Sequence, residues 1–158
     1  MTGGVIFLGY RSRIAVTELA ATSSLAMSAL ATDQKGQIAL LKVQLAAAKN
    51  GALVFLPSIP CRYDLVIDYK GRLYRAQVKY ADCKAQNSQG ALRLDLRRRK
   101  RLYTREEVDV LLVYIPQIDG VCWFEPEVFD STMNLQLRML PTRNGQKRGC
   151  LMVEEFVW

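Results

Sequence analysis

Apolar positions recur along the chain with two different periods, and each period predicts a different kind of secondary structure. In residues 33–50 the apolar positions lie three or four residues apart, at Ile38, Leu41, Leu45 and Ala48. This spacing predicts an amphipathic helix that packs on a core through that apolar side. Asp33 is a suitable N-cap, and the Asn50–Gly51 pair favours termination, so we expect the helix to end there.

Shorter apolar runs follow, and their β-branched and aromatic residues predict strands. Five such runs occupy residues 52–57, 64–69, 72–80, 108–116 and 121–124. The Lys70–Gly71 pair between the second and third runs favours a tight turn, which predicts a β-hairpin. The fourth run, VDVLLVYIP, is the most apolar, so we expect a central strand that is covered on both faces.

The order of these elements predicts the fold class. One helix, three strands, a basic segment and a further strand favour an α/β fold, with a mixed central sheet flanked by helices. A short turn or helix at 126–130 and two short strands around the TRNGQKRG turn complete the expected tail. We expect one domain over residues 33–158 and an N-terminal extension over residues 1–32. No apolar run reaches the roughly 18 residues of a membrane span.

The positive charge of the chain is concentrated in one stretch. The formal net charge is +7, and residues 79–105 hold nine basic and two acidic residues, whereas the rest of the chain is balanced. Such a focused field suits a polyanion such as double-stranded DNA, although a solvated basic loop or helix is the alternative. If residues 91–103 are helical, Arg93, Arg97 and Lys100 share one face. The predicted DNA-binding residues of this stretch are Arg93, Arg97, Arg98, Arg99, Lys100 and Arg101.

A second, smaller basic patch surrounds the predicted turn at Asn144–Gly145. It consists of Arg143, Lys147 and Arg148. These side chains are candidates for contacts with DNA phosphates. A charged hairpin tip without any DNA contact is an equally open interpretation.

Histidine and cysteine usage excludes several kinds of catalytic site. The chain has no histidine, which excludes a Ser-His-Asp triad, a Cys-His pair and any His-ligated zinc site. The four cysteines are scattered and form no CxxC pair, so a zinc ribbon is disfavoured. They are typical of reduced thiols in a cytoplasmic protein.

Three polar residues of the predicted hairpin suit metal-assisted phosphodiester hydrolysis. That reaction needs a metal to polarise the phosphate, an activated water and a cation for the developing charge. Asp64 begins one strand of the hairpin, and Gln77 and Lys79 lie two residues apart on the other, so these two share one face. We therefore expect the three side chains to converge at the open end of the hairpin.

These residues belong to a longer motif. RYDLVID at 62–68, followed by GRLYRAQVK at 71–79, resembles the signature of the PD-(D/E)XK nucleases. The helix around Gly36 and the strand that begins at EVDVL occupy the places of that superfamily's first helix and fourth strand. The Gln-x-Lys variant more narrowly resembles the PD-(D/E)XK homing endonucleases encoded in cyanobacterial group I introns of transfer-RNA genes. The resemblance covers about residues 33–130.

The resemblance implies a restriction-endonuclease-like core and site-specific cleavage of double-stranded DNA. Asp64 and Gln77 would hold Mg²⁺ or Mn²⁺, and Lys79 would position water or stabilise charge on the phosphorane. The homing endonucleases that the chain resembles are homotetramers. This implies a homo-oligomer, either a dimer or a tetramer, that acts on paired half-sites.

One position departs from the family pattern. The superfamily usually has a glutamate on its first helix, about one turn after the glycine, and this chain has Leu40 there. A site with a single carboxylate binds Mg²⁺ weakly, which predicts weakened cleavage with DNA binding less affected. A catalytically decayed DNA-binding protein and a Holliday-junction resolvase or repair nuclease on the same core are the alternative functions.

Overall fold

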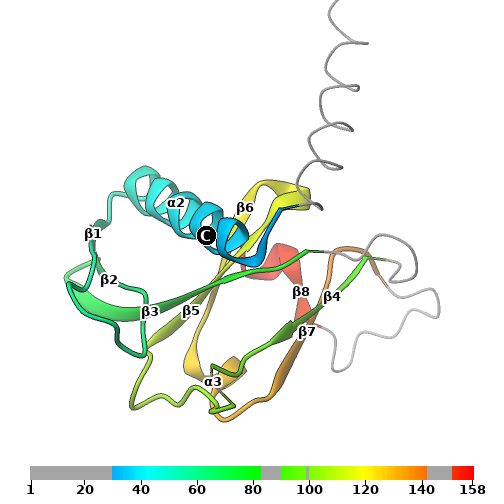
Figure 1. Cartoon of the computed structure of the whole chain (residues 1–158). Helices are drawn as coiled ribbons and strands as arrows, with labels where there is room; N and C mark the ends of the chain where they lie inside the picture. Colours follow the sequence, from blue (N-terminus) through cyan, green and yellow to red (C-terminus); the bar gives the residue numbers. More distant parts are fainter. Residues whose placement is uncertain (1–29, 83–89, 99, 142–150) are drawn as a thin grey trace, which may run out of the picture. The chain divides into compact units, whose positions relative to one another are not determined.

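The computed structural model describes residues 30–82, 90–98, 100–141 and 151–158, and Figure 1 shows its elements. Up to residue 82 these are helix α2 (Thr32–Lys49) and strands β1 (Leu53–Phe55), β2 (Leu65–Tyr69) and β3 (Arg72–Tyr80). From residue 90 on they are β4 (Ala91–Asp95), β5 (Val110–Ile115), β6 (Gly120–Phe124), α3 (Pro126–Phe129), β7 (Asn134–Arg138) and β8 (Leu151–Met152). Short 3-10 helices occupy Pro116–Ile118 and Val153–Glu155. Within the described ranges no helix is long and apolar enough to cross a membrane.

A five-stranded sheet in the order β1-β2-β3-β5-β6 forms the centre of the fold. Its neighbouring strands are antiparallel except β3 and β5, which run parallel. The predicted hairpin between β2 and β3 forms, because Lys70 (φ 52°) and Gly71 (φ 77°) both adopt the left-handed conformation that a two-residue turn requires. The expected mixed central sheet is therefore confirmed.

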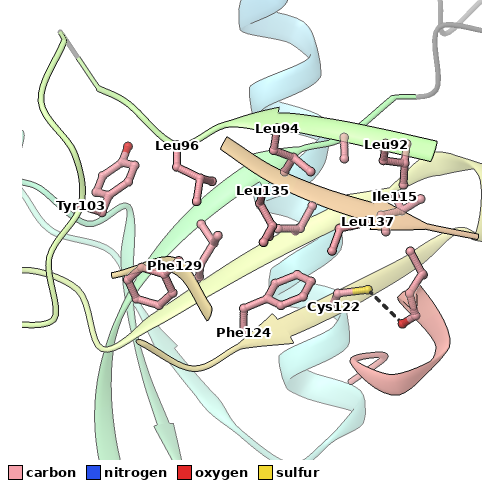
Figure 2. Packing of buried hydrophobic residues seen from close by; sticks show 14 of the residues in the cluster. Leu92, Leu94, Leu96, Tyr103, Ile115, Cys122, Phe124, Phe129, Leu135 and Leu137 are labelled. Atoms are coloured by element: carbon pink, nitrogen blue, oxygen red, sulfur yellow. Dashed lines mark hydrogen bonds between the residues drawn. The ribbon is translucent and has the colours of Figure 1, made fainter. Parts of the chain in front are cut away.

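Strand β5 is covered on both faces, as predicted. All six of its residues are buried. Leu111, Val113 and Ile115 belong to a core cluster with Phe124 of β6 and Leu137 of β7, which Figure 2 shows. This cluster fills the space between the five-stranded sheet and a second sheet of order β4-β7-β8. Helix α2 lies on the opposite side of the five-stranded sheet (Figures 1 and 2).

The basic segment that we expected to be partly helical begins instead as strand β4. Buried and exposed side chains alternate along it: Leu92, Leu94 and Leu96 are buried, and Arg93, Asp95 and Arg97 are exposed. This period of two is a strand pattern, and the helical prediction was wrong because arginine, a good helix former, concealed it. Arg93, Arg97 and Lys100 therefore do not share a helical face.

Helix α2 forms within one residue of its predicted ends, but it packs through a different face from the predicted one. Its buried residues are Ala39, Val43 and Ala47. Leu41 and Leu45, which we expected in the core, are 64% and 50% exposed. Small side chains four residues apart let the helix lie close to the sheet, and this close packing outweighs the larger apolar area of the leucines.

Candidate active site

Asp64 lies at the open end of the β2–β3 hairpin, one residue before β2 begins. Its backbone N–H donates to the carbonyl oxygen of Ala76 at 2.9 Å. Its carboxylate oxygen Oδ2 accepts the backbone N–H of Val78 at 3.0 Å. These two bonds hold the carboxylate against strand β3, where Gln77 and Lys79 lie.

Gln77 is buried beside Asp64, with only 5% of its surface exposed. Its amide nitrogen Nε2 donates to Oδ2 of Asp64 and to the carbonyl oxygen of Val78. Its amide oxygen Oε1 is buried and has no hydrogen-bond partner among the described residues. A buried oxygen without a donor is unfavourable unless water, an ion or a ligand satisfies it. This atom is therefore a candidate cation ligand next to a carboxylate.

Lys79 lies two residues further along β3 and rests on an aromatic ring. Its Nζ lies 5.2 Å from the centre of the Tyr103 ring, and the guanidinium carbon of Arg62 lies 4.8 Å from the same centre. Tyr103 is only 1% exposed, so the ring is a fixed surface for both cations. Burial lowers the pKa of the Lys79 amine, and the negative charges of Asp64 and Asp95 oppose that shift.

The predicted convergence of Asp64, Gln77 and Lys79 is present in the structure. Gln77 is bonded to Asp64, and the charge of Lys79 acts on the same carboxylate. Burial raises the pKa of Asp64, while the Val78 N–H and the charges of Arg98 and Lys79 oppose the rise. A partly desolvated carboxylate of this kind is stabilised in its ionised form by a nearby cation.

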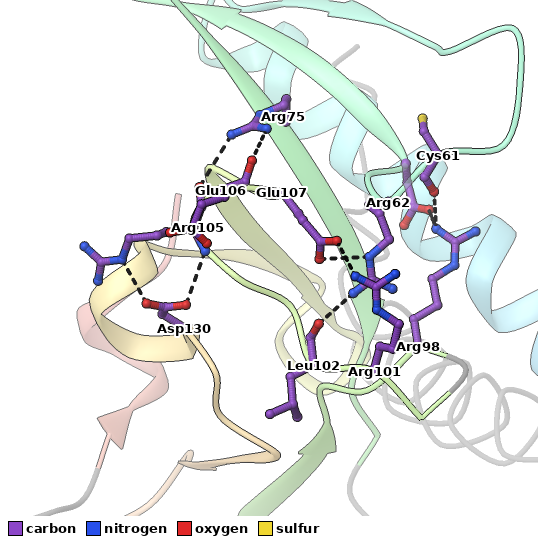
Figure 3. A network of polar contacts seen from close by, with 11 residues as sticks. Cys61, Arg62, Arg75, Arg98, Arg101, Leu102, Arg105, Glu106, Glu107 and Asp130 are labelled. Atoms are coloured by element: carbon purple, nitrogen blue, oxygen red, sulfur yellow. Dashed lines mark hydrogen bonds and ion pairs between the residues drawn. The ribbon is translucent and has the colours of Figure 1, made fainter.

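Arg98, in the segment after β4, brings a second cation to Asp64. Its Nη1 lies 4.0 Å from Oδ1 of Asp64 and donates to the carbonyl oxygen of Cys61 at 2.5 Å, as Figure 3 shows in part. Reciprocal backbone hydrogen bonds of 2.9 and 3.0 Å between Arg98 and Arg101 close a tight turn, in which Lys100 has a φ of 66°. Arg98 was predicted from the sequence as a DNA-binding residue, and its contact with Asp64 was not predicted.

An ion-pair network beside the site was not predicted from the sequence. Arg62 Nε lies 3.0 Å from Oε2 of Glu107, and Arg101 Nη2 lies 2.9 Å from Oε1 of the same carboxylate (Figure 3). Arg62 Nη2 also donates to the carbonyl oxygen of Leu102 at 2.7 Å. These bonds join the segment before β2 to the segment before β5. The RYD run contains Arg62, but no local pattern identifies its partner.

A cavity of about 390 Å³ opens beside the Asp64 carboxylate. Leu40 of α2, Ile59 and Pro60 of the segment before β2, and Arg98 are among the residues that line it. Leu40 thus lines the cavity from the helix position at which the family pattern has a glutamate. Its apolar side chain supplies no ligand there.

Comparisons with known proteins show the family to which the chain belongs. A family model described as PD-(D/E)XK endonuclease matches residues 30–158. The chain belongs to the PD-(D/E)XK endonuclease family. The solved structure of a bacterial homing endonuclease, I-Ssp6803I, is similar, with a TM-score of 0.63 and 26% identity over 80% of this chain and 86% of that one. No curated protein matches the chain. The predicted fold class and the prediction of a nuclease are confirmed.

Members of the PD-(D/E)XK endonuclease family generally depend on a divalent metal, and the residues of this site fit one with a reduced set of ligands. Asp64 offers one carboxylate, and the buried Oε1 of Gln77 offers one neutral oxygen. In the part of the chain that the structure describes, no group of three or more His, Cys, Asp or Glu side chains could hold a metal. Water and DNA phosphate oxygens would have to complete the coordination.

The other predicted DNA-binding residues of this PD-(D/E)XK endonuclease lie on several surfaces. Arg93 is exposed on β4, and Lys100 and Arg101 are exposed in the turn that follows. Arg97 Nη2 lies 2.5 Å from Oδ2 of Asp95, which neutralises part of its charge. The remaining members lie outside the described residues; they are Arg99, Arg143, Lys147 and Arg148.

Proposed function

We propose that this endonuclease is an intron-homing enzyme that cleaves a specific site in double-stranded DNA by Mg²⁺- or Mn²⁺-dependent phosphodiester hydrolysis. The observation that carries the proposal is the buried Oε1 of Gln77, which lies beside the Asp64 carboxylate and has no hydrogen-bond partner among the described residues, with Lys79 on the same face of the same strand. Similarity to a bacterial homing endonuclease supports the homing role. An origin in a cyanobacterial group I intron of a transfer-RNA gene is part of the same proposal.

Each residue of the site has a distinct role in this proposal. Asp64 and Gln77 hold the metal, which supplies Lewis acidity and an acidic bound water when present. Lys79, held over the Tyr103 ring, positions water or stabilises charge on the phosphorane. The residues proposed to bind DNA are Arg93, Arg97, Arg98, Arg99, Lys100, Arg101, Arg143, Lys147 and Arg148.

Cleavage of plasmids that carry intron-free transfer-RNA genes tests the proposal. The full chain with Mg²⁺ or Mn²⁺ is expected to cut one such gene at one site. Asp64→Asn and Lys79→Ala are each expected to reduce the rate by about 100-fold or more. Asp68→Asn, a matched change near the other end of β2, is expected to retain cleavage. Full activity of Asp64→Asn would contradict the proposed site.

Leu40 in the cavity favours a second candidate function, a DNA-binding protein that has lost catalysis. This second function predicts that the protein binds a duplex sequence-selectively and does not cleave it at any concentration of Mn²⁺. A Holliday-junction resolvase would instead cleave a four-way junction in preference to a linear duplex. Binding and cleavage of both DNA forms by the same preparation therefore separate the three functions.

We also propose a homo-oligomer, a dimer or a tetramer, with the nuclease domain in residues 33–158 and an N-terminal extension in residues 1–32. A chain of 158 residues covers little DNA, and paired half-sites lengthen the sequence that it can recognise. Light scattering of the full chain tests the assembly, and a monomer bound to DNA would contradict it. A chain that lacks residues 1–32 is expected to fold and cleave.

A further inference from the structure

Strands β4 and β7 are antiparallel neighbours in the second sheet, where β8 pairs with β7 at Leu137 and Arg138. We call the β4–β7 pair the ribbon, and it has one apolar and one polar face. Leu92 and Leu94 lie opposite Leu137 and Leu135, and none of the four is more than 4% exposed. The pairs that alternate with them project from the other face. We call these six residues the outer ribbon face: Ala91 opposite Arg138, Arg93 opposite Gln136, and Asp95 opposite Asn134.

The outer ribbon face carries side chains of the types that form specific hydrogen bonds with DNA bases in other proteins. Arginine forms bidentate hydrogen bonds with guanine, glutamine and asparagine form them with adenine, and a two-stranded β-ribbon fits the major groove. Arg93 and Gln136 are exposed and directly opposite each other. Arg93 Nε also donates to Oδ1 of Asn134 at 3.3 Å, so the polar groups of the two strands act together. The single acid, Asp95, is already paired with Arg97.

Strand β4 of the ribbon ends near the candidate active site. From Asp95, the last residue of β4, the chain continues to Arg98, whose guanidinium lies 4.0 Å from Asp64. Strand β4 has five residues, which span about 13 Å at roughly 3.3 Å per residue. That length corresponds to about four base pairs of DNA. The Asp95 end of the ribbon therefore lies three residues from a side chain that contacts Asp64.

We propose that the outer ribbon face reads about four base pairs next to the scissile phosphate through the major groove. Arg93 and Gln136 are its central specificity-determining residues, because they are exposed at the middle pair of the ribbon. The inference rests on the proposed function, since it requires a DNA substrate.

Selection of bound duplexes from a pool with a randomised centre tests whether the ribbon reads bases. The full chain is incubated with the duplexes without divalent metal, and the bound fraction is sequenced. Gln136→Ala is expected to lose roughly 5- to 150-fold of base preference at one position of the wild-type motif. Because glutamine is neutral, affinity for random duplex and its salt dependence are expected to stay unchanged. Arg93→Ala is expected to lose preference at an adjacent position and to weaken binding overall.

Two control variants separate base reading from charge. Gln117→Ala removes an exposed glutamine from the turn between β5 and β6 and is expected to leave the motif unchanged. Lys100→Ala removes an exposed charge without a base-reading role. It is expected to weaken binding to all sequences alike and to reduce the salt slope by about 1.

The outcomes distinguish the ribbon from the function on which it rests. A motif that is unchanged in both Arg93→Ala and Gln136→Ala would overturn the ribbon proposal and leave site-specific binding standing. A wild-type chain that enriches no motif would overturn the proposed function and the ribbon proposal together. If the two variants lose base preference at positions well beyond about four base pairs from the mapped cut, the proposed placement of the ribbon on the DNA would be contradicted.

Discussion

The guanidinium of Arg98 lies 4.0 Å from Oδ1 of Asp64, the carboxylate oxygen that Gln77 and Val78 do not engage. A positive charge therefore lies against Oδ1 of Asp64, the one acidic ligand in the proposed metal site. Such a charge opposes the binding of a divalent cation at that oxygen and attracts a phosphate to the same place. We therefore expect Arg98 to supply part of the positive charge that a metal ion bound by a second carboxylate would otherwise bring to the phosphate.

Substitution of Arg98 by alanine is expected to affect metal binding and cleavage in opposite directions. Without the guanidinium, Tb³⁺ binds Asp64 more tightly, because the electrostatic repulsion is removed. Cleavage at saturating Mg²⁺ falls by about 100-fold, because the developing charge on the phosphate loses a donor. Tb³⁺ luminescence and cleavage rates of the same preparation check both parts. Arg98→Lys keeps the charge, so its Tb³⁺ affinity and its cleavage rate are expected to lie between those of the parent and of Arg98→Ala. Unchanged cleavage by Arg98→Ala would refute a role of Arg98 in catalysis.

Replacement of Leu40 by glutamate is expected to strengthen the metal site. Leu40 lines the cavity at Asp64, so the new carboxylate enters the same space. A second negative charge a few ångströms away contributes on the order of 1–4 kcal/mol, which is roughly 5- to 1,000-fold in metal affinity. Cleavage is therefore expected at lower Mg²⁺ concentrations. Leu41→Glu is the matched control, because Leu41 is 64% exposed and does not line that cavity. Equal gains in both variants would show that general surface charge is responsible.

The site residues that could be predicted from the sequence are those whose positions follow from local geometry. Asp64, Gln77 and Lys79 lie on one hairpin, where the turn and the period of two decide which side chains meet. Arg98 meets Asp64 only because β4 joins a second sheet that packs on the first, and no local pattern encodes that contact. The same holds for the ion pair between Arg62 and Glu107.

The fold shows the same division between local pattern and tertiary packing. The ends of α2 and the hairpin follow from local signals, and both were predicted. The packing face of α2 depends on how closely the helix approaches the sheet. Apolar periodicity alone therefore selected Leu41 and Leu45, whereas the structure buries Ala39, Val43 and Ala47.

Two neighbouring alanines of α2 offer a direct test of that packing face. Ala47 is fully buried and Ala48 is exposed. Ala47→Leu is expected to lower the free energy of unfolding by about 1–3 kcal/mol, because the added side chain has no room against the sheet. Ala48→Leu is the same change one residue later and is expected to stay within about 0.5 kcal/mol of the parent. Urea denaturation compares the two, and the reverse order would support the face predicted from periodicity.

The ion pair between Asp109 and Arg75 predicts a pH-dependent contribution to stability. Asp109 accepts hydrogen bonds from the Arg75 backbone N–H at 2.8 Å and from Nε and Nη2 at 2.9 and 2.8 Å, which ties the start of β5 to β3. The side-chain bond to Arg75 lowers the pKa of Asp109 in the folded protein, although burial opposes the shift. The ionised carboxylate therefore stabilises the fold above its unfolded pKa of about 3.9, and this contribution is lost as the pH falls through the lower folded value.

Asp109→Asn removes that contribution and isolates it from other acid effects. Because Arg75 is 36% exposed, solvent weakens the pair, and we expect a loss of about 1 kcal/mol in the free energy of unfolding at pH 7. The difference between parent and variant is expected to shrink steadily below about pH 4, as Asp109 becomes neutral in the parent. Urea denaturation at pH values from 7 to 3 measures the difference, with Asp68→Asn as the matched control. A difference that stays constant across this range would mean that the amide disrupts packing and that the charge of Asp109 does not stabilise the fold.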